Sequence, residues 1–80
     1  DEERRREIVK GVKKVLEDEK TALRNFRRET KEFIEELEKE KEISEDDKFK
    51  GLEELQKITD DFTKKTEEAA AAKDKEIMQV

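Results

Sequence analysis

The sequence of 80 residues has no cysteine, histidine, tryptophan, tyrosine or proline, and it has only two glycines. The missing cysteine and histidine exclude a disulfide framework, the usual zinc sites and catalysis through imidazole or thiolate. Its longest purely apolar run is four alanines, residues 69–72, which is far too short to span a membrane. The charged N-terminus does not resemble a secretory signal. We therefore expect a protein that is not an enzyme and that uses no cofactor.

Charge is the most abundant feature, because 56% of the residues are charged and the net charge is −5. That net charge hides an uneven distribution. Residues 1–42 contain 13 basic and 14 acidic residues, whereas residues 43–80 contain 7 and 11. All six arginines lie in the first of these segments. The distribution of charge decides what a surface attracts, so an acidic total does not exclude a polyanionic partner.

Apolar residues in the first half of the chain recur with helical spacing. One row repeats every seven residues: Val9, Leu16, Leu23, Thr30 and Leu37. Two further rows lie beside it: Ile8, Val15 and Ala22, and Val12, Phe26 and Phe33. This spacing predicts one helix over about residues 2–42, with Asp1 as its N-cap.

The helical pattern breaks at residues 43–44 and then resumes. Ser44 and Asp47 have the spacing of a capping box, which predicts a second helix over about residues 45–78. We expect its buried side to consist of Leu52, Leu55, Ile58, Phe62, Ala69 and Ile77, interrupted by threonines. A short turn between long helices implies antiparallel neighbours, so the predicted fold is an all-α antiparallel hairpin forming one domain over residues 1–80.

The apolar stripe of the first helix is wider than one partner helix requires. A two-stranded seam uses two apolar rows, whereas this helix has three. We therefore expect a third helix from another segment or another chain, or self-association of the hairpin. Two helices of this composition alone would be marginally stable.

Basic residues form a line along one face of the first helix, at steps of three and four residues. Its eight positions are Arg6, Lys10, Lys13, Glu17, Lys20, Arg24, Arg27 and Lys31, and all but Glu17 are basic. It spans roughly 37 Å of helix axis, and such a line can follow a phosphate backbone with an affinity that falls steeply with salt. The face carries no interleaved aromatic residues, so recognition of phosphate, sugar and shape is favoured over stacking on single-stranded bases.

The alternative interpretation is a solvated face neutralised by ion pairs within the helix. Four cations of this region have an acid three or four residues away, in the pairs Lys10–Glu7, Lys13–Glu17, Arg28–Glu32 and Lys31–Glu35. Arg24 and Arg27 have none at those spacings, and their neighbours there include Lys20, Arg28 and Lys31. Arginine also suits phosphate geometry better than lysine, which favours a ligand-binding role unless the second helix supplies acids.

Other chemistry finds little support in the sequence. The acidic residues 45–47 could hold a hard cation weakly, but they lack the glycine and the ligand spacing of a calcium loop. We interpret them as the start of a helix, where negative charge is favourable. The only serine, Ser44, is better used as a cap than as a nucleophile.

The strings DEERRREIVK, ALRNFRRE, KEISEDD, LQKITD and KEIMQV occur in this order. Together they resemble the C-terminal part of bacterial and organellar ribosome recycling factors. The resemblance implies two helices of a three-helix bundle, with the first helix of the bundle and a smaller domain absent from this chain. It also implies a cytoplasmic location in bacteria, or the matrix or stroma of an organelle.

In that family the bundle lies on large-subunit ribosomal RNA, and the factor splits post-termination ribosomes together with elongation factor G. The resemblance implies that Arg24, Arg27 and Arg28 contact this RNA, with Arg27 mattering most. It adds Arg5, whereas the basic line contains Arg6 instead. Lys20 and Lys31 join the predicted RNA-binding set from the basic line. The alternative is a structural hairpin or coiled-coil module, a fragment or a design, without recycling activity.

Overall fold

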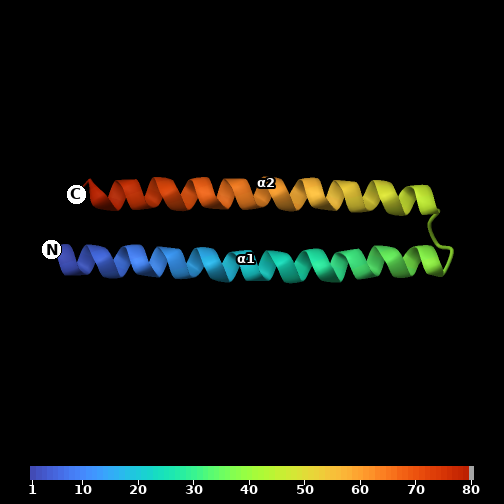
Figure 1. Ribbon diagram of the computed structural model, residues 1–80, viewed down its shortest axis with the longest axis horizontal. Coiled ribbons are helices and arrows are strands. Elements are labelled where there is room, and N and C mark those ends of the chain that lie inside the picture. Colours follow the sequence, from blue (N-terminus) through green and yellow to red (C-terminus); the bar gives the residue numbers. More distant parts are fainter. Residues whose placement is uncertain (80) are drawn as a thin grey trace.

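The computed structural model describes residues 1–79 and consists of two long helices side by side (Figure 1). Helix α1 spans Glu2–Lys39 and helix α2 spans Glu45–Met78. The helices run antiparallel, so both termini lie at one end of a rod measuring 60 × 15 × 9 Å. The predicted all-α hairpin is confirmed. Within the described residues, neither helix contains a stretch long and apolar enough to cross a membrane.

Helix α1 begins at the predicted cap. The Asp1 carboxylate accepts a hydrogen bond of 2.9 Å from the backbone N–H of Arg4. Glu2 and Glu3 follow in the first turn, where their negative charge complements the helix dipole. The local sequence therefore fixes this helix end without help from α2.

Helix α1 ends at Lys39, about three residues earlier than the periodicity predicts. Lys41 takes a left-handed backbone conformation with φ of 62°, which stops the helix. The Glu42 N–H then donates to the Leu37 carbonyl and the Lys41 N–H to the Glu38 carbonyl, both at 2.9 Å. This is a Schellman motif, in which glycine usually holds the left-handed position. This helix end cannot be recognised from the sequence, because a lysine occupies the left-handed position.

Helix α2 starts with the predicted capping box. The Ser44 hydroxyl accepts from the Asp47 N–H at 3.0 Å, and the Asp47 carboxylate accepts from the Ser44 N–H at 3.4 Å. Two backbone donors at the helix start are thereby satisfied by side chains. The reversal of the chain thus combines a Schellman motif with a capping box within residues 37–47.

The seam between the helices is thin. Among the described residues, only Leu55 and Thr59 are buried, with 7% and 4% of their surface exposed. The seven-residue row of α1 faces α2 and is half-buried throughout: Val9, Leu16, Leu23, Thr30 and Leu37. Because so little apolar surface is removed from water, the hairpin has a small hydrophobic contribution to stability.

The predicted buried side of α2 is partly wrong. Thr59, Thr63 and Thr66 point into the seam, whereas Ile58 and Phe62 are more than half exposed. The threonine hydroxyls can be buried because they bond within their own helix. Thr59 donates to the Gln56 carbonyl at 3.0 Å, and Thr63 donates to the Thr59 carbonyl at 2.9 Å.

Most of the apolar residues left out of the seam lie on one side of the rod, which we call the apolar face; Phe49 and Met78 are exposed elsewhere. Its most exposed members on α1 are Val15, Phe26 and Phe33, and on α2 Ile58 and Phe62, with 51–63% of each surface exposed. A long hollow on this face is lined by residues of both helices: Ile8, Gly11, Val12, Val15, Leu16, Phe62, Thr66, Ala69 and Ala70, with Glu19, Lys65 and Lys73. The surplus apolar stripe of α1 is therefore real and uncovered.

Candidate nucleic-acid interface

A second groove runs between the helices on the other side of the seam. Arg24, Arg27 and Lys20 contribute to it from α1, opposite Gln56 and Asp60 of α2. It shares no lining residue with the apolar hollow. Helical geometry gives the reason, because the seam residues of α1 lie between its apolar rows and its basic line around the helix. We call this side of the rod the basic face.

Arg27 reaches across the groove to α2. One nitrogen of its guanidinium donates a hydrogen bond of 3.0 Å to the side-chain oxygen of Gln56. The amide nitrogen of Gln56 in turn donates to the Asp60 carboxylate at 2.8 Å. Arg27 is therefore held by a neutral amide. The acid of this network, Asp60, bonds to Gln56 and not to Arg27.

Arg24 is also held by a neutral group, since its guanidinium donates to the Thr21 hydroxyl at 3.2 Å. Within residues 1–79, no carboxylate lies within 4 Å of a guanidinium nitrogen of Arg24 or Arg27. Helix α2 therefore does not neutralise the two arginines. They keep their positive charge and most of their hydrogen-bonding capacity, as an anion-binding surface requires.

Lys20 differs from the two arginines. Its ammonium lies 3.8 Å from the carboxylates of both Glu17 and Glu67, and 28% of its side chain is exposed. It bridges α1 to α2 at the edge of the groove. Of the predicted RNA-binding residues that line this groove, Lys20 is the one whose charge is paired with carboxylates.

Arg28 and Lys31 continue the basic face toward the turn. Together with Arg27 they line a neighbouring hollow over Leu52 and Leu55. The helical ion pairs expected from spacing are wrong: in the described part of the chain, Lys10, Lys13, Arg28 and Lys31 have no carboxylate within 4 Å. Exposed pairs of this kind are weak, and long side chains lose entropy in forming them.

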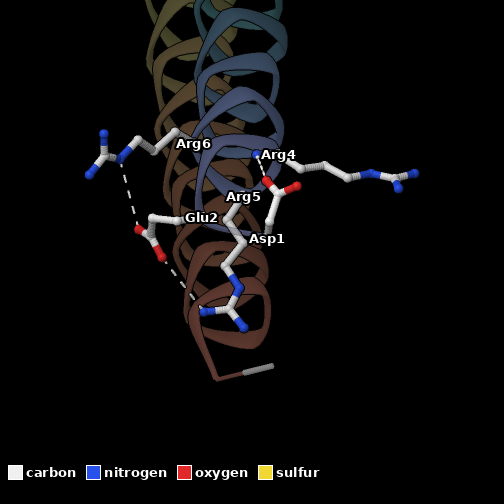
Figure 2. A network of polar contacts seen from close by, with 5 residues as sticks. All are labelled: Asp1, Glu2, Arg4, Arg5 and Arg6. Carbon is white, nitrogen blue, oxygen red and sulfur yellow. Dashed lines mark hydrogen bonds and ion pairs between the residues drawn. The ribbon is translucent and has the colours of Figure 1, made fainter.

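Arg5 lies apart from this cluster. Figure 2 shows Arg4 and Arg6 extending to opposite sides of α1, with Arg5 directed between them toward the end of α2. Arg5 and Arg6 both approach Glu2, at 3.9 and 3.8 Å. Arg5 is partly buried and lines a hollow with Ile77, whereas Arg6 lies beside Lys10 and Lys13 on the basic face. The structure thus places Arg6, rather than Arg5, in register with the basic line.

The sequence did not point to Gln56 as a residue of the site. Its contact with Arg27 depends on the antiparallel register, which also brings Lys20 to Glu67 and Glu38 to Lys48. The position of the turn could have indicated this contact. With the turn at residues 40–44, the antiparallel pairing determines which residues of α2 lie opposite residue 27. Glutamine in a charge-rich helix gave no reason to single it out.

The acidic segment at residues 45–47 serves the start of α2. Asp47 completes the capping box, and Asp46 pairs with Lys50 at 2.9 Å. Over residues 1–79, no group of three or more acidic side chains is arranged to hold a metal ion. The geometry agrees with the helix-start interpretation of these acids.

Comparison with known proteins gives a consistent result. The family model described as Ribosome recycling factor matches residues 1–78. The chain is 56% identical over 78 residues to a ribosome-recycling factor of Syntrophobacter fumaroxidans, covering 98% of this chain and 42% of the relative. It is 57% identical over 79 residues to that of Anaeromyxobacter dehalogenans, strain 2CP-1, covering 99% and 42%. No solved structure gives a significant match.

A less similar relative is matched over a similar share of its length. The ribosome-recycling factor of Symbiobacterium thermophilum is 49% identical over 79 residues, covering 99% of this chain and 43% of the relative. The chain therefore spans less than half the length of the curated relatives that it matches.

Proposed function

The chain belongs to the ribosome recycling factor family, and from this premise we propose that its basic face binds the ribosomal RNA of the large subunit. The proposed contacts are Arg24, Arg27 and Arg28, supported by Lys20 and Lys31. Arg5 is proposed as a separate contact at the far end of the rod, because it lies outside the basic groove.

The observation that supports this proposal is the state of the two central arginines. Arg24 and Arg27 are held by a hydroxyl and an amide, and neither contacts a carboxylate within the described residues. Two guanidinium groups at this spacing repel each other, and an RNA phosphate would relieve that repulsion. Their planar forks can also form bidentate contacts with phosphate oxygens.

The shape of the molecule favours RNA recognition through the backbone. The basic residues from Lys20 to Lys31 extend over roughly 16 Å of a straight helix. Neither of the two hollows on this stretch of the basic face is lined by an aromatic residue, which argues against stacking on single-stranded bases. A rod with these features suits the phosphates and the shape of a folded RNA.

The apolar face supports the rest of the proposal. We propose that a third helix, from another segment or another chain, covers it and completes a three-helix bundle; a second copy of the hairpin is the competing occupant. Ribosome splitting with elongation factor G, acting through a smaller domain, is proposed for a complete factor of the relatives' full length. The site of action would be the bacterial cytoplasm, or the matrix or stroma of an organelle.

The direct test is binding of the chain to purified large ribosomal subunits at two ionic strengths. We expect Arg27→Ala to weaken binding roughly tenfold, as expected for the loss of one charge-assisted contact. Lys57→Ala is the matched control, because Lys57 is exposed on α2 and lines neither basic hollow. Equal losses from the two variants would contradict the proposal, since they would indicate a nonspecific effect of charge.

A structural interaction module is the second candidate, and the uncovered apolar face favours it. In that case the chain acts by recruiting a helix, and RNA binding plays no part. It predicts a melting temperature that rises with protein concentration, because association stabilises the folded state. Sedimentation would contradict this candidate if it showed a well-folded monomer at low micromolar concentration, because the chain would then need no partner to fold.

A further inference from the structure

We infer that Gln56 is a positioning residue for Arg27, holding its guanidinium across the basic groove without neutralising it. The inference rests on the proposed RNA-binding function of Arg27 and adds a requirement on α2 that the basic line on α1 does not contain. In this account α2 contributes a neutral acceptor to the site rather than a phosphate contact.

The geometry is a chain of three side chains across the groove. Arg27 donates to the Gln56 oxygen at 3.0 Å, and the Gln56 nitrogen donates to Asp60 at 2.8 Å. The bond from Gln56 to Asp60 fixes which end of the amide faces Arg27, because an amide that donates to a carboxylate must present its oxygen on the other side. Asp60 thus orients Gln56, and Gln56 orients Arg27.

The choice of an amide has an electrostatic consequence. A glutamate at position 56 would have nearly the same shape, but it would place a full negative charge beside Arg27 and form an ion pair. The guanidinium would then have to leave that pair before it could bind a phosphate. Glutamine uses one of the five donors of arginine and leaves the charge and the other donors available.

Thr21 acts in the same way on the neighbouring arginine. Its hydroxyl accepts from Arg24 at 3.2 Å, so both central arginines rest on neutral oxygen atoms. The Gln56 contact differs in spanning the two helices, between residues 29 positions apart in the sequence. Gln56 therefore makes the orientation of Arg27 depend on the hairpin being folded.

The experiment compares Gln56→Glu with Gln79→Glu in binding to purified large subunits across a range of salt concentrations. Gln79 is the other glutamine of the chain, and it caps the far end of α2, so the control makes the same chemical change with the same loss of net charge. We expect Gln56→Glu to weaken binding roughly tenfold. The slope of log affinity against log salt should fall by about one, the value for the loss of one phosphate contact. Gln79→Glu should change neither value appreciably.

A double variant shows whether Gln56 acts through Arg27. Once Arg27→Ala is in place, adding Gln56→Glu should weaken binding no more than adding Gln79→Glu does. The variant Gln56→Met, which keeps the length of the side chain and removes the acceptor, should weaken binding by less than Gln56→Glu. A melting curve close to that of the parent chain shows that each variant is folded.

The possible outcomes separate the two proposals. If Arg27→Ala weakens binding while Gln56→Glu matches Gln79→Glu, the inference about Gln56 is overturned and the RNA-binding proposal stands. If Gln56→Glu weakens binding equally with and without Arg27, Gln56 acts on its own and the inference is again wrong. If Arg27→Ala itself has no effect, the proposed function fails before Gln56 is tested.

Discussion

The two long faces of the hairpin are incomplete in different ways. The apolar face has large side chains in contact with water, including Phe26, Phe33 and Phe62, each more than half exposed. The basic face has Arg24 and Arg27 without a carboxylate in contact, within the described residues. The first is completed by removing apolar surface from water, which salt hardly weakens, and the second by a polyanion, whose binding salt weakens strongly.

This difference indicates that folding and partner binding use separate parts of the rod: the seam serves folding, and the apolar face and the basic face serve binding. The seam holds the hairpin together, and it contains the two residues that are buried in the described part of the chain, Leu55 and Thr59. The two faces beside it are exposed, and we expect their contacts between the helices, such as Lys20 with Glu67 and Arg27 with Gln56, to add little to folding. Substitutions in each of these parts should therefore have different consequences, and the following variants test that separation.

The largest effect on stability is expected in the seam. Leu55→Ala removes the one buried apolar side chain of the described residues and should cost about 2–4 kcal/mol. For a domain of this size the melting temperature should fall by at least about 10 °C, measured by circular dichroism. Ile58→Ala is the matched control, because Ile58 lies on the same helix and is 53% exposed. Comparable losses from both would show that seam and apolar face are not distinct.

The next effect concerns the apolar face. The combined variant Phe26→Ser, Phe33→Ser should abolish any dependence of the melting temperature on protein concentration, because it removes apolar surface that association would bury. Binding to large ribosomal subunits by the monomer should stay unchanged. Phe49→Ser is the control, since Phe49 is 57% exposed but lies seven residues before Gln56, on the side of α2 that borders the basic groove rather than on the apolar face. A loss of RNA binding in the double variant would mean that the two faces are coupled.

The smallest effect is expected at Gly11, which lines the apolar hollow and has no atom within 4 Å of where a Cβ would be. Gly11→Ala should stabilise the hairpin by up to about 1 kcal/mol through helix propensity, raising the melting temperature by a few degrees. Gly51→Ala should also stabilise, as its Cβ would contact Ile34 at an ordinary distance of 3.6 Å. A decrease in stability for Gly11→Ala would show that something already packs closely against this position.

The features set by local chemistry could be predicted from the sequence. The cap at Asp1 and the capping box of Ser44 and Asp47 are confirmed, because each involves groups only three residues apart. The surplus apolar stripe of α1 could also be predicted, since helical periodicity alone assigns its residues to three rows. The end of α1 was not, because it depends on Lys41 adopting a conformation that lysine seldom takes.

The features set by the pairing of the helices could not be predicted with the same success. A hydrophobicity pattern favours Ile58 and Phe62 over threonine for the seam, but the register buries Thr59 and exposes both apolar residues. The same register creates the contact of Arg27 with Gln56. The sequence showed that Arg24 and Arg27 lack acids along their own helix, and only the structure could show that α2 supplies none within 4 Å.

The measurement that tests the account most directly is the salt dependence of binding to purified large ribosomal subunits. Comparing the parent chain with the variant Arg24→Ala, Arg27→Ala, we expect the slope of log affinity against log salt to fall by about two. That result would mean that both arginines exchange counterions for RNA phosphates. An unchanged slope, with the double variant folded, would show that these charges face solvent only and would contradict the account.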